Sequence, residues 1–264
     1  MLTRQPKNAL DGGSGESSLK NGAAGGRRAW LAMTVGLLVA YSLPIAPFRG
    51  PIEYLLDSLT SVSNVSAWTV GTLEQQIATA LLILAIVHFW ERRPFRSAGF
   101  RKVSSADVSA AVVTWLAAEC VEVAMKHLPT FFSPSLAVHP SPNSFHLMLV
   151  SFPEWSRISL VVGNSFAEEV GRAYVIERLN EVTGSLYAAA FLALLFSLGE
   201  HAVYGGFENV LVYFPGQLSL VLLYLWRRNT MTCVLSHTLA NGFGLIVWYH
   251  LPVGVNHLLH RLGF

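Results

Sequence analysis

The sequence predicts an all-α protein, a polytopic bundle of about seven transmembrane helices. Hydrophobic residues make up 52% of the 264 residues and charged residues only 13%, whereas about a quarter of a typical soluble domain is charged. About seven apolar runs approach the ~20 residues that a helix needs to cross the hydrocarbon core. With seven spans, the main clusters of basic residues all fall on one side of the membrane, as the positive-inside rule requires.

This composition excludes whole-chain disorder, a coiled coil, a secreted disulfide scaffold and a nucleic-acid binder as main interpretations, and the net charge of +2 calls for no polyanionic partner. Cys120 and Cys233 lie far apart in apolar segments and fit no zinc spacing, so we expect two buried thiols. Residues 1–26 are rich in glycine and serine and predict a disordered cytoplasmic tail. Residues 27–264 form the predicted transmembrane domain.

The predicted spans take their limits from charged and aromatic residues. The first follows a pair of arginines, the second ends on an aromatic pair, the third carries two glutamates, and the last four lie between residues 156 and 250. They cover residues 29–48, 71–90, 105–127, 156–181, 186–203, 208–226 and 230–250. Two shorter pieces, 52–63 and 144–152, suit an interfacial amphipathic helix and a short or re-entrant helix, because neither is long enough to cross.

The basic residues also predict orientation. They precede the first span, fill the loop between the second and third, and follow the fourth and sixth, which places the N-terminus inside and the C-terminus outside. Tryptophans fall at the expected span ends, as in an aromatic belt. We therefore expect a multi-pass protein of the cell membrane, the cytoplasmic membrane if the chain is bacterial.

Ionisable residues inside membrane spans are costly and mark function by default. The first such place is an acidic pair, Glu168-Glu169, followed by Arg172. Both glutamates lie one helical turn from the arginine, at i+4 and i+3. A base in a dry site and a structural ion pair both fit this pattern.

Two further polar places lie on later spans. His201 stands near the end of the fifth span, where a site residue and a loop residue are both open alternatives. His237 and Asn241 are four apart in the seventh span and point the same way. They suit either a site or a polar clasp between helices, because in lipid only the protein can satisfy them.

The expected depth in the membrane favours one site that contains both the acidic pair and His201. Glu168 lies 16 residues before Gly184 and His201 lies 17 residues after it, so an antiparallel hairpin turning near Gly184 brings both to a similar depth, roughly 25 Å from the turn. His237 is only 8 residues past Asn229 and fits this depth less well.

These three motifs, in this order on three hydrophobic segments, resemble the CPBP family of intramembrane glutamic endopeptidases, which is related to the CAAX prenyl endopeptidase and includes bacteriocin-immunity and bacteriocin-processing proteins. The resemblance covers about residues 160–250. The third motif, HxxxN, matches unchanged at His237 and Asn241. The first motif, from Glu168 to Arg172, is one residue shorter than EExxxR, and the second, from Phe196 to His201, is one residue longer than FxxxH. Either Ala167 and Glu168 occupy the acidic positions, or Glu168 and Glu169 do and the arginine is displaced.

The resemblance implies hydrolysis of a peptide bond in or beside the membrane. A glutamate of the pair, Glu168 first, would be the general base on a water molecule held with His201. His237 and Asn241 would form the oxyanion hole, while Glu169 and Arg172 orient the base. The scheme needs no cofactor and no metal, and its partners are the bilayer and a membrane protein or lipidated peptide. A non-catalytic scaffold or immunity-type protein, a small transporter and a zinc site are the alternatives.

Overall fold

The computed structural model describes residues 30–32, 34–36, 38–39, 64–132, 152–243 and 246. These residues contain helices and no strand, which confirms the predicted all-α class for this part of the chain. The predicted tail at 1–26 and the pieces at 52–63 and 144–151 lie outside the described residues.

The observed helices follow the predicted spans closely. They are α3 (Asn64–Ala85) with the π-helix η1 (Ile86–Trp90), the 3-10 helix η2 (Phe95–Ala98), α4 (Ser105–Phe132), α6 (Glu154–Thr183), α7 (Leu186–Arg227) and α8 (Thr230–Gly242). Of the first predicted span, the described residues within 30–39 are helical. The fifth and sixth predicted spans fall together in α7.

One described helix, over Ser105–Met125 in α4, is long and apolar enough to cross a membrane, and the apolar stretches Gln76–Trp90 and Leu186–Gly199 are shorter. Large apolar side chains on α4, including Val113, Leu116 and Val121, are exposed. The seven-span arrangement is therefore not confirmed.

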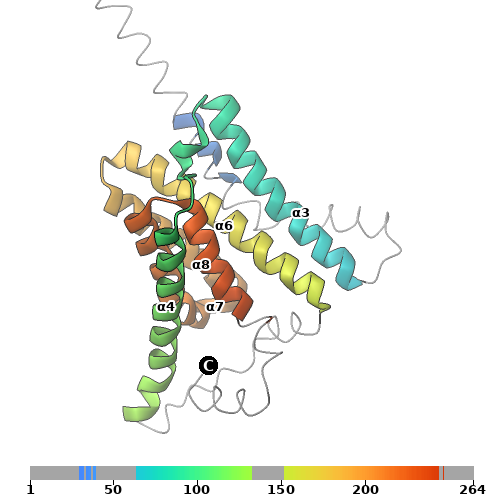
Figure 1. Ribbon diagram of the computed structural model, residues 1–264, viewed down its shortest axis with the longest axis vertical. Helices are drawn as coiled ribbons and strands as arrows, with labels where there is room; N and C mark the ends of the chain where they lie inside the picture. Colours follow the sequence, from blue (N-terminus) through green and yellow to red (C-terminus); the bar gives the residue numbers. More distant parts are fainter. Residues whose placement is uncertain are drawn as a thin grey trace, which may run out of the picture.

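Helix α6 occupies the centre of the bundle (Figure 1). It packs against α3 on one side and against α7 and α8 on the other, while α4 contacts α7 and α8. The apolar core follows α6, where Val170, Tyr174 and Ile176 are fully buried. Any side chain that α6 presents to its neighbours therefore has contacts available from several helices.

The turn after α6 lies where the sequence places it. Gly184 adopts a left-handed conformation (φ 67°), and its N–H donates to the carbonyl of Asn180 at 2.9 Å. Ser185 then caps α7 by accepting from the N–H of Ala188 at 3.3 Å. A glycine that closes one helix and a serine that opens the next form a standard helix–helix junction.

Helix α7 is one continuous helical run that doubles back. Ser197 and Gln217 both contact Arg172 of α6, although 20 residues of straight helix would separate them by about 30 Å. Leu194 and Val221 also share one small core. Residues near Ser197 and near Gln217 therefore lie on two arms of α7 that run side by side. Pro215 lies inside the second arm, and a proline within a helix removes one backbone hydrogen bond and favours a bend.

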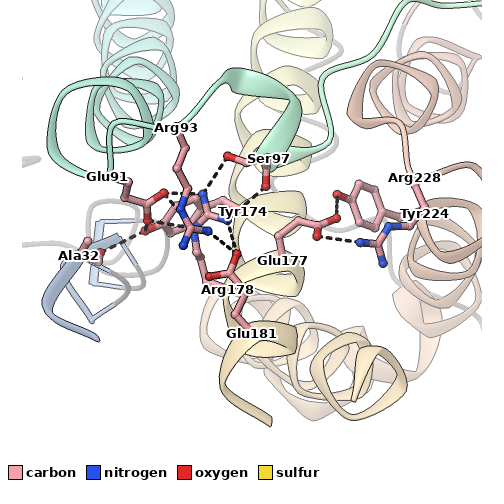
Figure 2. A network of polar contacts seen from close by, with 10 residues as sticks. All are labelled: Ala32, Glu91, Arg93, Ser97, Tyr174, Glu177, Arg178, Glu181, Tyr224 and Arg228. Carbon is pink, nitrogen blue, oxygen red and sulfur yellow. Dashed lines mark hydrogen bonds and ion pairs between the residues drawn. The ribbon is translucent and has the colours of Figure 1, made fainter. Parts of the chain in front are cut away.

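A buried polar network fastens the N-terminal part of the bundle to α6 (Figure 2). Arg178 donates from Nε to both carboxylate oxygens of Glu91 at 2.9 Å, and from its terminal nitrogens to Ser97 at 3.2 Å. The hydroxyl of Tyr174 donates toward Glu91 at 3.0 Å and toward the carbonyl of Ala32 at 3.1 Å. We call Glu91, Tyr174 and Arg178 the Arg178 clamp.

The loop before α4 is held against the start of α8. The N–H of Thr230 donates to the carbonyl of Gly99 at 2.9 Å, and its hydroxyl donates to the carbonyl of Ala98 at 2.8 Å. Nearby, Arg227 at the end of α7 pairs with Asp107 in the first turn of α4 at 2.8 Å. These contacts fix the relative positions of α4, α7 and α8, and hence of any site between them.

Candidate active site

The sequence-predicted residues Glu168, Glu169, Arg172 and His237 come together between α6 and α8. We call these four residues the carboxylate–histidine cluster. Glu168 and Glu169 are adjacent on α6, so their side chains leave the helix about 100° apart. The two carboxylates consequently have different surroundings.

Glu169 is the buried member of the pair. Its side chain is 1% exposed, and its Oε1 atom receives the guanidinium of Arg172 and lies 2.8 Å from Nδ1 of His237. Arg172 therefore pairs with Glu169 at i+3 and not with Glu168 at i+4. A buried carboxylate requires such partners, because desolvating an unpaired charge is very unfavourable.

Arg172 is itself fully engaged with α7. Its guanidinium donates to Oε1 of Gln217, and its Nε donates to the hydroxyl of Ser197 at 3.4 Å. Both partners are buried. Arg172 thus ties Glu169 to both arms of α7, which holds the carboxylate at a fixed position.

Glu168 is the accessible member of the pair, with 27% of its side chain exposed. Its Oε2 lies 3.8 Å from Nε2 of His237, too far for a hydrogen bond. Its Oε1 accepts a hydrogen bond at 2.6 Å from Nδ2 of Asn164, four residues earlier on α6. This carboxylate therefore keeps one oxygen without a close protein donor among the described contacts, beside the histidine.

His237 bridges the two carboxylates. A carboxylate only accepts hydrogen bonds, so Nδ1 of His237 must carry the proton that it shares with Glu169. That contact fixes the ring orientation and leaves Nε2 facing Glu168. The third-motif partner Asn241 lies one turn later on α8, where its Nδ2 contacts the hydroxyl of Ser165 at 3.5 Å.

His201 belongs to the helical run of α7, but its side chain lies outside what the structure describes. The predicted meeting of His201 with Glu168 thus stays a prediction. In the described part of the chain, no group of three or more histidine, cysteine and acidic residues could hold a metal ion.

Several polar residues of the site do not come from the motifs. Gln217 is an interior contact of Arg172, although its sequence position suggests only an end or packing residue. Asn164 lies at i−4 from Glu168, a spacing that could have identified it. Gln76, which contacts Asn164, comes from the distant α3 and carries no local signal.

The site brings several functional groups together in largely buried surroundings. One accessible carboxylate stands beside an oriented imidazole, and a carboxamide follows on the same helix. Such a set can remove a proton from a water molecule and stabilise a developing oxyanion. The same contacts also join α6 to α8, so they have a structural effect whatever the chemistry.

The comparisons with known proteins agree with the motif analysis. Residues 150–243 match the family model described as type II CAAX prenyl endopeptidase Rce1-like. No curated protein and no solved structure matches the chain. The matched segment covers α6, α7 and α8, which carry the whole cluster. The match of residues 150–243 to the Rce1-like model confirms the CPBP and CAAX-protease resemblance predicted from the three motifs.

Proposed function

We propose that this chain is an intramembrane endopeptidase that hydrolyses a peptide bond of a membrane protein or lipidated peptide with a water molecule activated by Glu168. One observation carries the proposal: His237 lies between a buried carboxylate that fixes its ring and an accessible carboxylate that faces its free nitrogen. The proposal includes a location in the cell membrane, with about seven spans. The word CAAX describes the family and does not by itself define a prenylated substrate.

The two glutamates take different roles. Glu168 is assigned as the base because its carboxylate is accessible, whereas Glu169 is enclosed by Arg172 and His237. Glu169 and Arg172 are assigned to orient His237. This division favours the alignment in which Glu168 and Glu169 are the acidic pair and the arginine is displaced by one residue.

The reaction is balanced without a cofactor. Glu168 accepts a proton from water, and the water oxygen bonds to the carbonyl carbon of the scissile peptide. The resulting oxyanion accepts hydrogen bonds from Nε2 of His237 and from the amide of Asn241. The carbon–nitrogen bond then breaks, and Glu168 returns its proton to the leaving amine. His201 is assigned, from the family resemblance, to hold the water.

The contact of Nδ1 of His237 with Glu169 leaves Nε2 as the ring nitrogen that can face the oxyanion. Because Nδ1 already carries a proton, Nε2 can donate to an oxyanion only when the ring is an imidazolium. A neutral ring would instead present Nε2 as an acceptor to the water. His237 therefore acts in the imidazolium form while the oxyanion is present.

The test is cleavage of lipidated C-terminal peptides and membrane-protein peptides by the purified full chain. Glu168→Gln is expected to lower kcat by about 10²–10⁴-fold, the range for loss of a general base. His237→Ala and His201→Ala are expected to lower it as well, and a chelator to have no effect. Glu181→Gln, at the exposed end of α6, is the matched control. Cleavage that survives Glu168→Gln would contradict the assignment, and chelator-sensitive cleavage would instead indicate a metal site.

A non-catalytic scaffold of the immunity type is the second candidate. The observation that favours it is the buried pairing of Arg172 with Glu169, which joins α6 to α7 and α8. For a scaffold, Glu168→Gln would change stability, and no variant would affect cleavage because the folded wild type would cleave nothing.

A further inference from the structure

We propose that Asn164 and Gln76 form a hydrogen-bonded relay that positions the carboxylate of Glu168. The inference rests on the proposed function, in which Glu168 is the base. We call Asn164 and Gln76 the amide relay. Neither touches reacting atoms, so both are assigned as positioning residues.

The relay consists of two short hydrogen bonds in series. Nε2 of Gln76 donates to Oδ1 of Asn164 at 2.6 Å, and Nδ2 of Asn164 donates to Oε1 of Glu168 at 2.6 Å. All three side chains are half-buried. The accessible carboxylate is thus attached through one amide to its own helix and through a second amide to α3.

The ionised carboxylate of Glu168 determines which group donates and which accepts in both hydrogen bonds of the amide relay. An ionised glutamate only accepts hydrogen bonds, so Asn164 must turn its NH₂ group toward Glu168. Its oxygen then faces Gln76, which must in turn present its own NH₂ group. Each amide orientation follows from the one before it, so the two hydrogen bonds form one directed series that ends on Glu168.

The far end of the relay is also defined. Nε2 of Gln76 donates to Asn164, whereas the buried Oε1 atom of Gln76 has no hydrogen-bond partner among the described residues. That oxygen lies against Gly163, where an added Cβ would be 3.1 Å from it and 2.6 Å from Cδ2 of Leu73. Glycine at this position therefore permits the close approach of α3 that brings Gln76 to Asn164.

The relay extends the site beyond the matched family segment. Gln76 lies in α3, whereas the family match begins at residue 150. The N-terminal half of the chain consequently contributes to the geometry of the base. Losing a hydrogen bond that fixes a base costs catalysis because small displacements from the reactive geometry are heavily penalised, by up to about 100-fold per ångström.

The first experiment separates positioning from binding in the full-length protein. Asn164→Ala and Gln76→Leu are each expected to lower kcat by about 10- to 100-fold with KM unchanged. Because the bonds act in series, the double variant is expected to be no slower than Asn164→Ala alone. Ile77→Ala, next to Gln76 and 49% exposed, is the matched control and is expected to keep the wild-type kcat.

A second measurement needs no cleavage. Dicyclohexylcarbodiimide reacts with protonated carboxyl groups in apolar surroundings, and the product on each glutamate is quantified by mass spectrometry. Asn164 occupies Oε1 of Glu168, so Asn164→Ala is expected to free that oxygen and to speed labelling of Glu168 several-fold, and Gln76→Leu to speed it less. Glu169 is enclosed in every variant and serves as the internal reference.

The outcomes distinguish the relay from the reaction. Faster labelling of Glu168 together with lower kcat at constant KM would support the relay. Unchanged labelling in Gln76→Leu and Asn164→Ala would overturn it, even if the wild type cleaves peptides. A wild type that cleaves nothing, with labelling that follows both substitutions, would support the relay's hold on Glu168 and overturn the proposed reaction. Should Asn164→Ala fail to fold, Gln76→Leu decides the question by the same readouts.

Discussion

Neutralising one side of the Arg178 clamp is expected to destabilise the fold severely. The substitution is Glu91→Gln, which preserves side-chain size and removes the negative charge. Glu91 and Arg178 are 4% and 3% exposed, and Arg178 contacts both carboxylate oxygens. In the variant, the new NH₂ group faces the guanidinium, so a buried cation loses its main partner and one donor opposes another.

Removing one partner of a buried ion pair costs about 3–5 kcal/mol, because the remaining charge stays desolvated. Glu91→Gln belongs at the lower end, about 3 kcal/mol, since Arg178 keeps its contacts with Ser97 and with Glu181 at 3.1 Å. At about 2–4 °C per kcal/mol for a chain of this size, the midpoint of unfolding should fall by roughly 6–12 °C.

The assay is thermal unfolding of purified protein in detergent, compared at one scan rate because unfolding of such proteins is often irreversible. The matched control is Arg93→Gln, which breaks the exposed pair of Arg93 with Glu181, whose side chains are 37% and 40% exposed. Exposed pairs contribute at most about 1 kcal/mol. A midpoint for Glu91→Gln no lower than that for Arg93→Gln would refute the reasoning that the clamp is desolvated.

Three other changes have defined outcomes. Gly99→Ala is expected to cost about 2–4 kcal/mol, measured as a lower unfolding midpoint, because φ is 80° and the new Cβ would lie 2.5 Å from the hydroxyl of Tyr224. Gly184→Ala, also at positive φ but with no atom within 4 Å of the Cβ, should cost only about 1 kcal/mol in the same assay, and an equal loss at both sites would contradict the role of the Tyr224 contact. Arg172→Lys keeps the charge but cannot bond Glu169, Gln217 and Ser197 together, so cleavage assays should give a kcat about 10–100-fold lower, whereas wild-type kcat would show that the buried charge alone suffices.

The sequence predicts the helices well because long, mostly apolar runs separated by polar turns define them. Apolar runs with polar turns place the limits of α4 and α6 within a few residues of those observed, and Gly184 marks the junction with α7. Helical spacing also predicts that Arg172 can pair with a glutamate one turn away. His237 is associated with that pair through the family resemblance, because the depth argument alone fits His237 less well.

What the sequence does not predict is partner choice across helices. Both glutamates can reach Arg172 at helical spacing, and only the rotation of α6 against α7 and α8 assigns the arginine to Glu169. Gln76 is a single amide on α3 with no pattern around it, and its contact with Asn164 depends on how closely α3 approaches Gly163. Such contacts depend on packing geometry, which local periodicity does not encode.

The asymmetry of the acidic pair is the strongest argument for chemistry over a purely structural role. A polar clasp between helices needs only Glu169, which already satisfies Arg172 and His237 and joins α6 to both α7 and α8. Glu168 contributes less to that clasp, because its 3.8 Å contact with His237 is too long for a hydrogen bond, yet two amide side chains hold it in place. A second carboxylate beside the first costs stability through like-charge repulsion. An accessible, oriented carboxylate next to a histidine with a free nitrogen is the arrangement that water activation requires, which is why Glu168→Gln is the substitution that separates the two candidate functions.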